Sequence, residues 1–155
     1  MTDLTDLLRS DAVLTGIAVL GKKALLVALA AALARQTGAD ARVIGEALTS
    51  RERLGSTGFG GGVAIPHAKV DGVSQVTAVF ARLAHPIDYG AVDAAPVDLV
   101  WAMLSPPAAG ADHLKALARV SRRLRDRAFL AKLRGAGSPD ALYALFAADR
   151  ARDAA

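Results

Sequence analysis

The sequence contains no cysteine, so disulfide bonds and cysteine-ligated metals are excluded, and a reducing compartment suits the composition. The N-terminus has no basic segment followed by an apolar run, so we expect no secretory signal peptide. The most apolar run, Ala24–Ala34, is too short to cross a bilayer. We therefore expect a cytoplasmic chain with no membrane insertion.

Aromatic residues are also scarce, at 5% of the chain, whereas 53% of its residues are hydrophobic. Alanine, leucine and valine must therefore fill the core. A length of 155 residues is typical of one domain. We expect a single domain over 1–155, with about 149–155 as a frayed tail.

The excess of positive charge is small, with a formal net charge of +4. The basic residues concentrate between Arg119 and Arg127, where a helix would place arginines on one face and apolar residues on the other. A solvated helix face explains this pattern, and no aromatic residues alternate with the arginines. The sequence therefore does not indicate a nucleic-acid partner.

Helix and strand patterns alternate along the chain, which predicts an α/β fold. The segment 97–104 is almost wholly apolar, as expected of a central strand covered on both faces. Helices on both faces of the sheet would make a three-layer sandwich. The predicted elements are helices over 5–9, 22–37 (ended by Gly38), 41–53, 113–124, 128–133 and 138–147, and strands over 12–20, 76–84 and 97–104.

A glycine-rich segment, "GSTGFGGGVAIPHA", runs from Gly55 to Ala68. It lacks the Gly-Lys-Ser/Thr ending of a nucleotide-binding P-loop, and Val63 stands where the dinucleotide fingerprint needs glycine. It also has no Gly-x-Ser-x-Gly nucleophile elbow. The glycines therefore indicate close approach of the backbone to another group.

That group is predicted to be His67, since an imidazole can act as nucleophile or base near neutral pH. Pro66 restricts the backbone just before the ring, and small residues leave it accessible. The alternative interpretation is a turn histidine without a chemical role.

Two further residues are predicted to lie near His67. Arg51 continues the inner stripe of the helix over 41–53 and suits an anion, although it could equally complement the end of that helix. His113 is expected in the first turn of its helix, with Asp112 as N-cap and its ring toward the sheet. An exposed first-turn histidine is the alternative. Together these residues would form a phosphate site without a metal; His85 is expected at the surface.

Several stretches resemble the mannitol/fructose-type IIA components of the phosphoenolpyruvate-dependent phosphotransferase system, in particular their nitrogen-regulatory branch. The resemblance covers about Lys22 to Phe146 and rests on "RERLGSTGFGGGVAIPHAKV", "HPIDYGAVDAAPVDLVWAML", "DHLKALARVSRRLRD" and "ALYALF". It implies a mixed β-sheet between helices. It also implies a stoichiometric phosphocarrier with His67 as the phosphorylated nucleophile, His113 as the assisting histidine and Arg51 stabilising the phosphoryl group.

The resemblance further implies an HPr-type phosphocarrier protein of the nitrogen branch as donor, regulated proteins downstream, and neither a cofactor nor a metal. Alternatives are a sugar-specific component that passes phosphate to a IIB domain, a hydrolase using His67 as base, and a binding module. The loop expected to surround the phosphoryl group comprises Ser56, Thr57, Gly58, Gly60, Gly61 and Gly62. Its backbone N–H groups would balance charge, while Ser56 and Thr57 would mainly shape the turn.

Overall fold

The structure, a computed structural model, describes residues 4–154 and the side chains of residues 4–148. A six-stranded mixed sheet forms its centre, in the order β1-β5-β6-β3-β2, with β4 also paired to β6. The strands are β1 (Leu8–Ile17), β2 (Gly58–Gly60), β3 (Val63–Ala64), β4 (His67–Lys69), β5 (Thr77–Ile87) and β6 (Val97–Ser105). The helices are α1 (Lys22–Thr37), α2 (Ala41–Leu54), α3 (Ala111–Arg123), α4 (Arg127–Gly135) and α5 (Pro139–Ala154).

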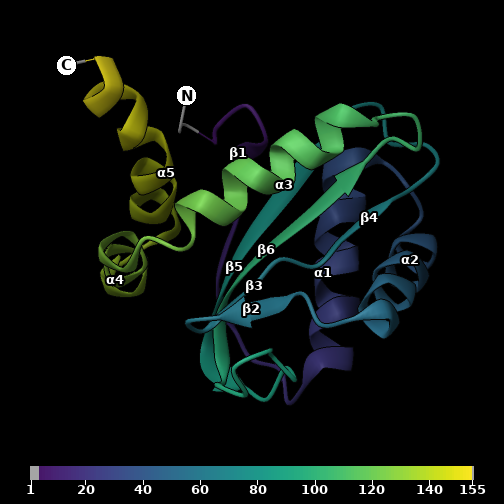
Figure 1. Ribbon diagram of the computed structural model, residues 1–155, viewed down its shortest axis with the longest axis horizontal. Helices are drawn as coiled ribbons and strands as arrows, with labels where there is room; N and C mark the ends of the chain where they lie inside the picture. The colour runs from purple at the N-terminus through teal and green to yellow at the C-terminus, as the bar shows by residue number, and fades with distance from the viewer. Residues whose placement is uncertain (1–3, 155) are drawn as a thin grey trace.

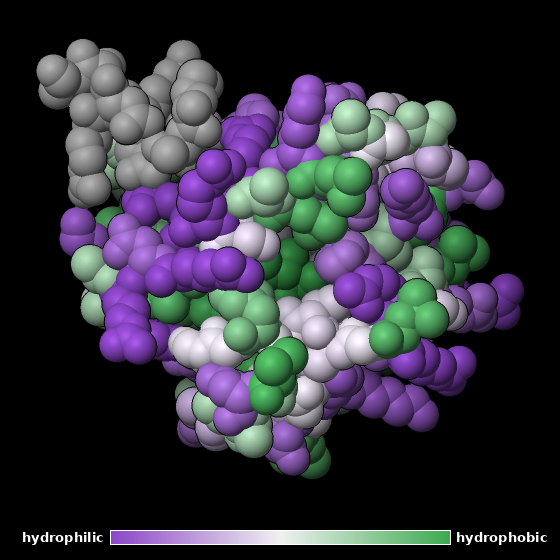
Figure 2. Space-filling view, in the orientation of Figure 1, coloured by the Kyte–Doolittle hydropathy of each residue, from purple (hydrophilic) through white to green (hydrophobic). Residues whose placement is uncertain are grey.

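Helices cover both faces of this sheet, as the sequence predicts. In Figure 1, α3 crosses in front of β5 and β6, α1 lies behind them, and α4 and α5 gather at one end. Figure 2 shows the face carrying α3, where hydrophilic side chains line the edges and near-neutral or hydrophobic ones gather over the centre. The predicted α/β three-layer sandwich with a mixed sheet is confirmed.

Strand β6 organises the sheet, because every residue in it except Asp98 is buried. It pairs antiparallel with β5 and parallel with both β3 and β4. The scarce aromatic residues pack next to it: the Phe146 ring lies 4.9 Å from that of Phe80 and 5.5 Å from that of Trp101, between ring centroids. Phe146 thereby anchors α5 to the sheet.

Two predictions for the first twenty residues need correction. The predicted helix over 5–9 is wrong, since residues 5–7 form a turn and residues 8 and 9 begin β1. The strand predicted over 12–20 begins earlier, at Leu8, and ends at Ile17. Parallel pairing with β5 draws the earlier residues into the sheet, beginning at Leu8 opposite Ala78. Such pairing is a tertiary contact that local periodicity does not encode.

Helix ends follow local signals in most places. Gly38 ends α1 in the left-handed conformation, with φ 78°, and Ser138 Oγ accepts a hydrogen bond from the N–H of Ala141 at the start of α5. The prediction that Asp112 caps α3 is wrong, because Gly110 occupies the N-cap and Asp112 lies within the first turn. The frayed tail predicted over 149–155 stays a prediction, because the side chains of these residues are outside the described part of the chain. Within residues 4–154, no helix is both long and apolar enough to span a bilayer.

Candidate functional site

His67 is the first residue of β4 and is held directly against the central strand. The N–H of Met103 donates to the carbonyl of Pro66, and His67 pairs with Met103 in the sheet register. The half-buried His67 ring contacts the carbonyl oxygen of Ile65 through Nδ1, at 2.7 Å. Because a carbonyl oxygen only accepts, Nδ1 carries the proton in the neutral ring. The lone pair of Nε2 is therefore the one available to an electrophile.

His113 lies beside His67, as the sequence predicts, although the two residues are far apart in the chain. Their ring centroids are 5.6 Å apart, and the ring planes are inclined by 52°. His113 is buried in the first turn of α3, and its Nδ1 lies 2.6 Å from Oγ of Ser105, the fully buried last residue of β6. The contact with Ser105 occupies Nδ1 and leaves Nε2 of His113 for a ligand.

Arg51 completes the predicted group from the last turn of α2. Its Nη1 donates to the carbonyl oxygen of Gly55, just past the helix end, at 2.9 Å. Its positive charge also acts on His67, whose pKa it lowers. Arg51 is thus a cation at a helix terminus whose charge acts on the predicted nucleophile.

Both histidine rings have a pKa below the ordinary value of 6.5. For His67, burial is the main cause, and the positive charge of Arg51 adds to it; the Ile65 carbonyl and the charge of Glu52 oppose it. For His113, burial is again the main cause, followed by the charges of His67 and Lys69. Both rings are therefore neutral at pH 7, which suits His67 for nucleophilic attack and His113 for hydrogen-bond donation.

We expect the His67 ring protons to titrate with a midpoint below pH 6.5 in an NMR titration of the folded chain. A lowered pKa means that the ring stays neutral as the pH falls through the ordinary value of 6.5, and becomes protonated only below it. The same chain unfolded in denaturant provides the reference midpoint. A folded midpoint at or above that of the unfolded chain would contradict this assignment.

The glycine-rich segment contains the β2–β3 hairpin, whose turn lies away from His67. Gly60, Gly61 and Gly62 have φ values of 117°, 70° and 82°, which favour glycine. In the sheet register the turn lies opposite Asp98 and Leu99, whereas His67 lies opposite Met103, about 13 Å further along β6 at about 3.3 Å per residue.

The turn is held by its own partners, because the N–H of Gly61 donates to Asp93 and its carbonyl accepts from Arg134. The prediction that Gly60, Gly61 and Gly62 surround the phosphoryl group is therefore wrong. These glycines serve the tight turn of the β2–β3 hairpin.

The base of the hairpin lies nearer the predicted site. Ser56 Oγ accepts from the N–H of Gly58 at 3.1 Å, so Ser56 shapes the turn as predicted. A Cβ on Gly58 would lie 2.8 Å from that of Ala91, which explains the glycine by close packing. The Thr57 hydroxyl is buried and bonded to Glu52 and Tyr89.

Glu52 is a buried residue near the site that the sequence pattern did not single out. The buried stripe of α2 consists of Ile44, Leu48 and Glu52, and the half-buried Arg51 stands at its edge instead of continuing it. The spacing of four residues from Leu48 to Glu52 was a usable signal, because it places a carboxylate on the apolar face. Ser105 was also missed; its only signal was a polar residue directly after an apolar strand.

Among the described residues, no group of three or more histidine, aspartate or glutamate side chains is placed to hold a metal ion. The side chains gathered at the candidate site are the two imidazoles of His67 and His113 and the guanidinium of Arg51.

Comparisons with known proteins identify the family of this chain. Residues 6–149 match the profile of the family described as the phosphoenolpyruvate-dependent sugar phosphotransferase system, EIIA 2. The nitrogen regulatory protein of Bradyrhizobium diazoefficiens is 46% identical over 144 residues, covering 93% of this chain and 94% of the relative. That of Klebsiella oxytoca is 36% identical over 141 residues, covering 90% and 87%.

Solved structures show the same fold. The crystal structure of the nitrogen regulatory protein IIA-Ntr from Neisseria meningitidis superposes with a TM-score of 0.87 at 31% identity, covering 92% of this chain and 98% of that one. The mannitol IIA structure from Escherichia coli, at 20% identity, shares the fold with a TM-score of 0.76 over 89% of this chain and 97% of that one. By the match of most of its length, the chain belongs to the EIIA type-2 family of the phosphoenolpyruvate-dependent phosphotransferase system.

Proposed function

We propose that this chain is a phosphocarrier that accepts a phosphoryl group on Nε2 of His67 from a phosphorylated HPr-type protein. The observation that carries the proposal is the pairing of two neutral imidazoles, in which the Ile65 carbonyl holds the proton of His67 on Nδ1 and His113 lies 5.6 Å away between ring centroids. Membership of the phosphotransferase family supplies the class of donor.

The transfer can be written with the groups present. The Nε2 lone pair of His67 forms the new N–P bond while the N–P bond of the donor phosphohistidine breaks, and the donor imidazole leaves with the electron pair. The proton of His67 stays on Nδ1 throughout, hydrogen-bonded to the Ile65 carbonyl. One N–P bond replaces a similar one, so the protein has only to align the reactants and balance the charge on the phosphoryl group. Arg51 supplies positive charge, and His113 Nε2–H can donate to a phosphoryl oxygen.

We assign a regulatory role to this carrier, with regulated proteins rather than a sugar permease downstream. The support is that the nitrogen regulatory protein of Bradyrhizobium diazoefficiens matches 93% of the chain at 46% identity. We infer that such a component is used stoichiometrically and acts in the cytoplasm.

A second candidate function is phosphate delivery to a sugar-specific IIB domain. A fructose-specific EIIA component of Haloferax volcanii is 48% identical over 79 residues, about half of each chain. The solved complex of mannitol IIA with phosphorylated IIB from Escherichia coli has the same fold, with a TM-score of 0.77 at 19% identity.

The testing experiment incubates the chain with radiolabelled phospho-HPr-type donors from the nitrogen branch and from the sugar branch. We expect acid-labile, base-stable label on this chain, faster from the nitrogen-branch donor, and a phosphorus-coupled Nε2 resonance in NMR. Faster labelling from the sugar-branch donor, with onward transfer to a IIB domain, would favour the second candidate. Absence of label from both donors would reject phosphocarrier function.

A further inference from the structure

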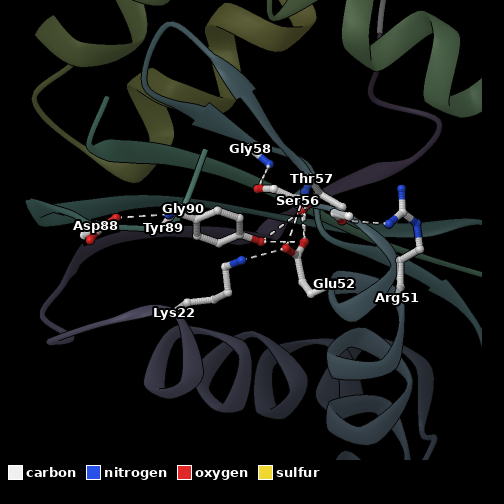
Figure 3. A network of polar contacts seen from close by, with 10 residues as sticks. Lys22, Arg51, Glu52, Ser56, Thr57, Gly58, Asp88, Tyr89 and Gly90 are labelled. Atoms are coloured by element: carbon white, nitrogen blue, oxygen red, sulfur yellow. Dashed lines mark hydrogen bonds and ion pairs between the residues drawn. The ribbon is translucent and has the colours of Figure 1, made fainter. Parts of the chain in front are cut away.

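A buried carboxylate lies on the side of the residue 55–58 loop away from Arg51 (Figure 3). Glu52 is only 9% exposed, yet its two oxygens receive hydrogen bonds from three side chains and one backbone group. Lys22 Nζ and the Tyr89 hydroxyl each lie 2.9 Å from it, and the N–H of Thr57 lies 3.2 Å from one oxygen and 3.3 Å from the other. The Thr57 hydroxyl also contacts the carboxylate.

These donors come from separate parts of the chain. Lys22 begins α1, Thr57 precedes β2, and Tyr89 follows β5. Burial raises the pKa of Glu52, but the bonds from Thr57, Lys22 and Tyr89 outweigh burial, so the pKa lies below its ordinary value and the group is ionised. A carboxylate with so many donors fixes their relative positions more firmly than a neutral acceptor would.

A continuous path of hydrogen bonds leads from this carboxylate to the ring of His67. Glu52 holds both the N–H and the hydroxyl of Thr57. The carbonyl of Thr57 accepts from the N–H of Ile65 at 3.0 Å. The carbonyl of Ile65 in turn engages His67 Nδ1 at 2.7 Å. The Ile65 carbonyl, which keeps the His67 proton on Nδ1, is therefore held in place through Thr57 by the Glu52 carboxylate.

Arg51 is tied to the same residue by the backbone. The N–H of Gly55 donates to the main-chain carbonyl of Glu52 at 3.1 Å, and the carbonyl of Gly55 accepts from Arg51 Nη1 at 2.9 Å. Hydrogen bonds that begin at Glu52 therefore lead both to the His67 ring and to the Arg51 guanidinium.

We propose, building on the proposed phosphocarrier function, that Glu52 is a positioning residue for phosphoryl transfer: its carboxylate fixes Thr57 and, through Ile65, holds the His67 ring with the Nε2 lone pair outward. Glu52 itself touches neither the phosphoryl group nor the donor. Its contribution is to keep the nucleophile aligned, and misalignment by about 1 Å in an active site can cost about a hundredfold in rate.

The test uses Glu52→Gln in the full chain, with single-turnover transfer measured over a range of phospho-donor concentrations. The amide keeps the size of the side chain but can accept at only one of its two ends, so at least one of the four donors loses its partner. We expect the maximal transfer rate to fall by about tenfold to a hundredfold. The donor concentration at half-maximal rate should stay unchanged, because the docking surface is intact.

Two matched comparisons separate positioning from a general loss of stability. Thr57→Val removes the hydroxyl and should slow transfer, whereas Thr57→Ser restores the hydroxyl and should recover most of that loss. Asp98→Asn removes a half-exposed ion pair with Arg134, 2.8 Å between nitrogen and oxygen, at the far end of the hairpin. It should leave the maximal rate as in the wild type.

A second readout does not depend on phosphoryl transfer at all. The ¹⁵N chemical shifts of the His67 ring report which nitrogen carries the proton. We expect one Nδ1–H tautomer in the wild type and a mixture of the two tautomers in Glu52→Gln. If the wild type takes up no phosphoryl group, the proposed function fails, and the tautomer measurement still decides the role of Glu52.

A folded Glu52→Gln variant with the wild-type tautomer would overturn the proposal. If the wild type accepts a phosphoryl group, a wild-type maximal rate in Glu52→Gln would also overturn it. If Glu52→Gln does not fold, Tyr89→Phe takes its place, because it removes one hydroxyl donor to Glu52 and keeps the buried ring. A mixed tautomer in Tyr89→Phe would support the proposal, and an unchanged single tautomer would contradict it.

Discussion

His67→Ala is expected to abolish phosphoryl uptake from a phosphorylated HPr-type donor, with no label above background at any donor concentration. The substitution removes the Nε2 lone pair that forms the N–P bond in the proposed reaction, and no other side chain can take over that role from the same place. His113 is the nearest alternative imidazole, but it is buried and its Nδ1 is engaged by Ser105. The measurement is radiolabel transfer resolved by gel electrophoresis.

The fold should survive this change. The half-buried ring makes one hydrogen bond, to the Ile65 carbonyl, and such a bond contributes about 0.5–1.5 kcal/mol to stability. His85→Ala is the matched control, because His85 is an exposed histidine on β5. It should accept label at the wild-type rate. Label on His67→Ala at the wild-type rate would show that the nucleophile is another residue.

Arg51→Ala is expected to slow transfer by about tenfold to a thousandfold while leaving some uptake measurable. The positive charge of the guanidinium acts on the His67 ring, whose pKa it lowers. Its loss would leave the charge that develops on the phosphoryl group less well compensated. The rate should be measured by rapid quench at saturating donor.

Arg53→Ala provides the control for this experiment, since Arg53 is a basic residue of the same last helical turn and is exposed. A helix-end charge contributes similarly from either position, so a purely structural role would give similar effects in both variants. Equal rates in Arg51→Ala, Arg53→Ala and the wild type would mean that Arg51 only complements the helix terminus.

Much of the fold was predictable because its signals are local. Glycine in the left-handed conformation at Gly38 and the Ser138–Pro139 start of α5 are properties of a few consecutive residues. The apolar run of β6 likewise predicted its central position in the sheet. The predicted helix over residues 5–9 is wrong because only pairing with β5, far along the chain, makes the segment from Leu8 onward a strand.

For the candidate site too, local sequence shows some features and only packing of the chain decides the others. The sequence by itself determined the chemical character of the site, because an accessible histidine after Pro66, a second histidine at a helix start and an arginine at a helix end are visible as residue types in order. Only the tertiary structure decided which of them meet. The 5.6 Å pairing of His67 with His113 depends on β4 lying beside β6 and on α3 starting just after β6.

The tertiary structure also decided where the glycines and the carboxylate act. Gly60, Gly61 and Gly62 are close to His67 in sequence, which led to the prediction that they surround its phosphoryl group. The hairpin instead places their turn beside Asp98, away from His67. Glu52 was overlooked because the donors that make its burial possible, Lys22 and Tyr89, are remote in sequence. A charged side chain is buried only where partners compensate it, and those partners are brought together by packing of the whole chain.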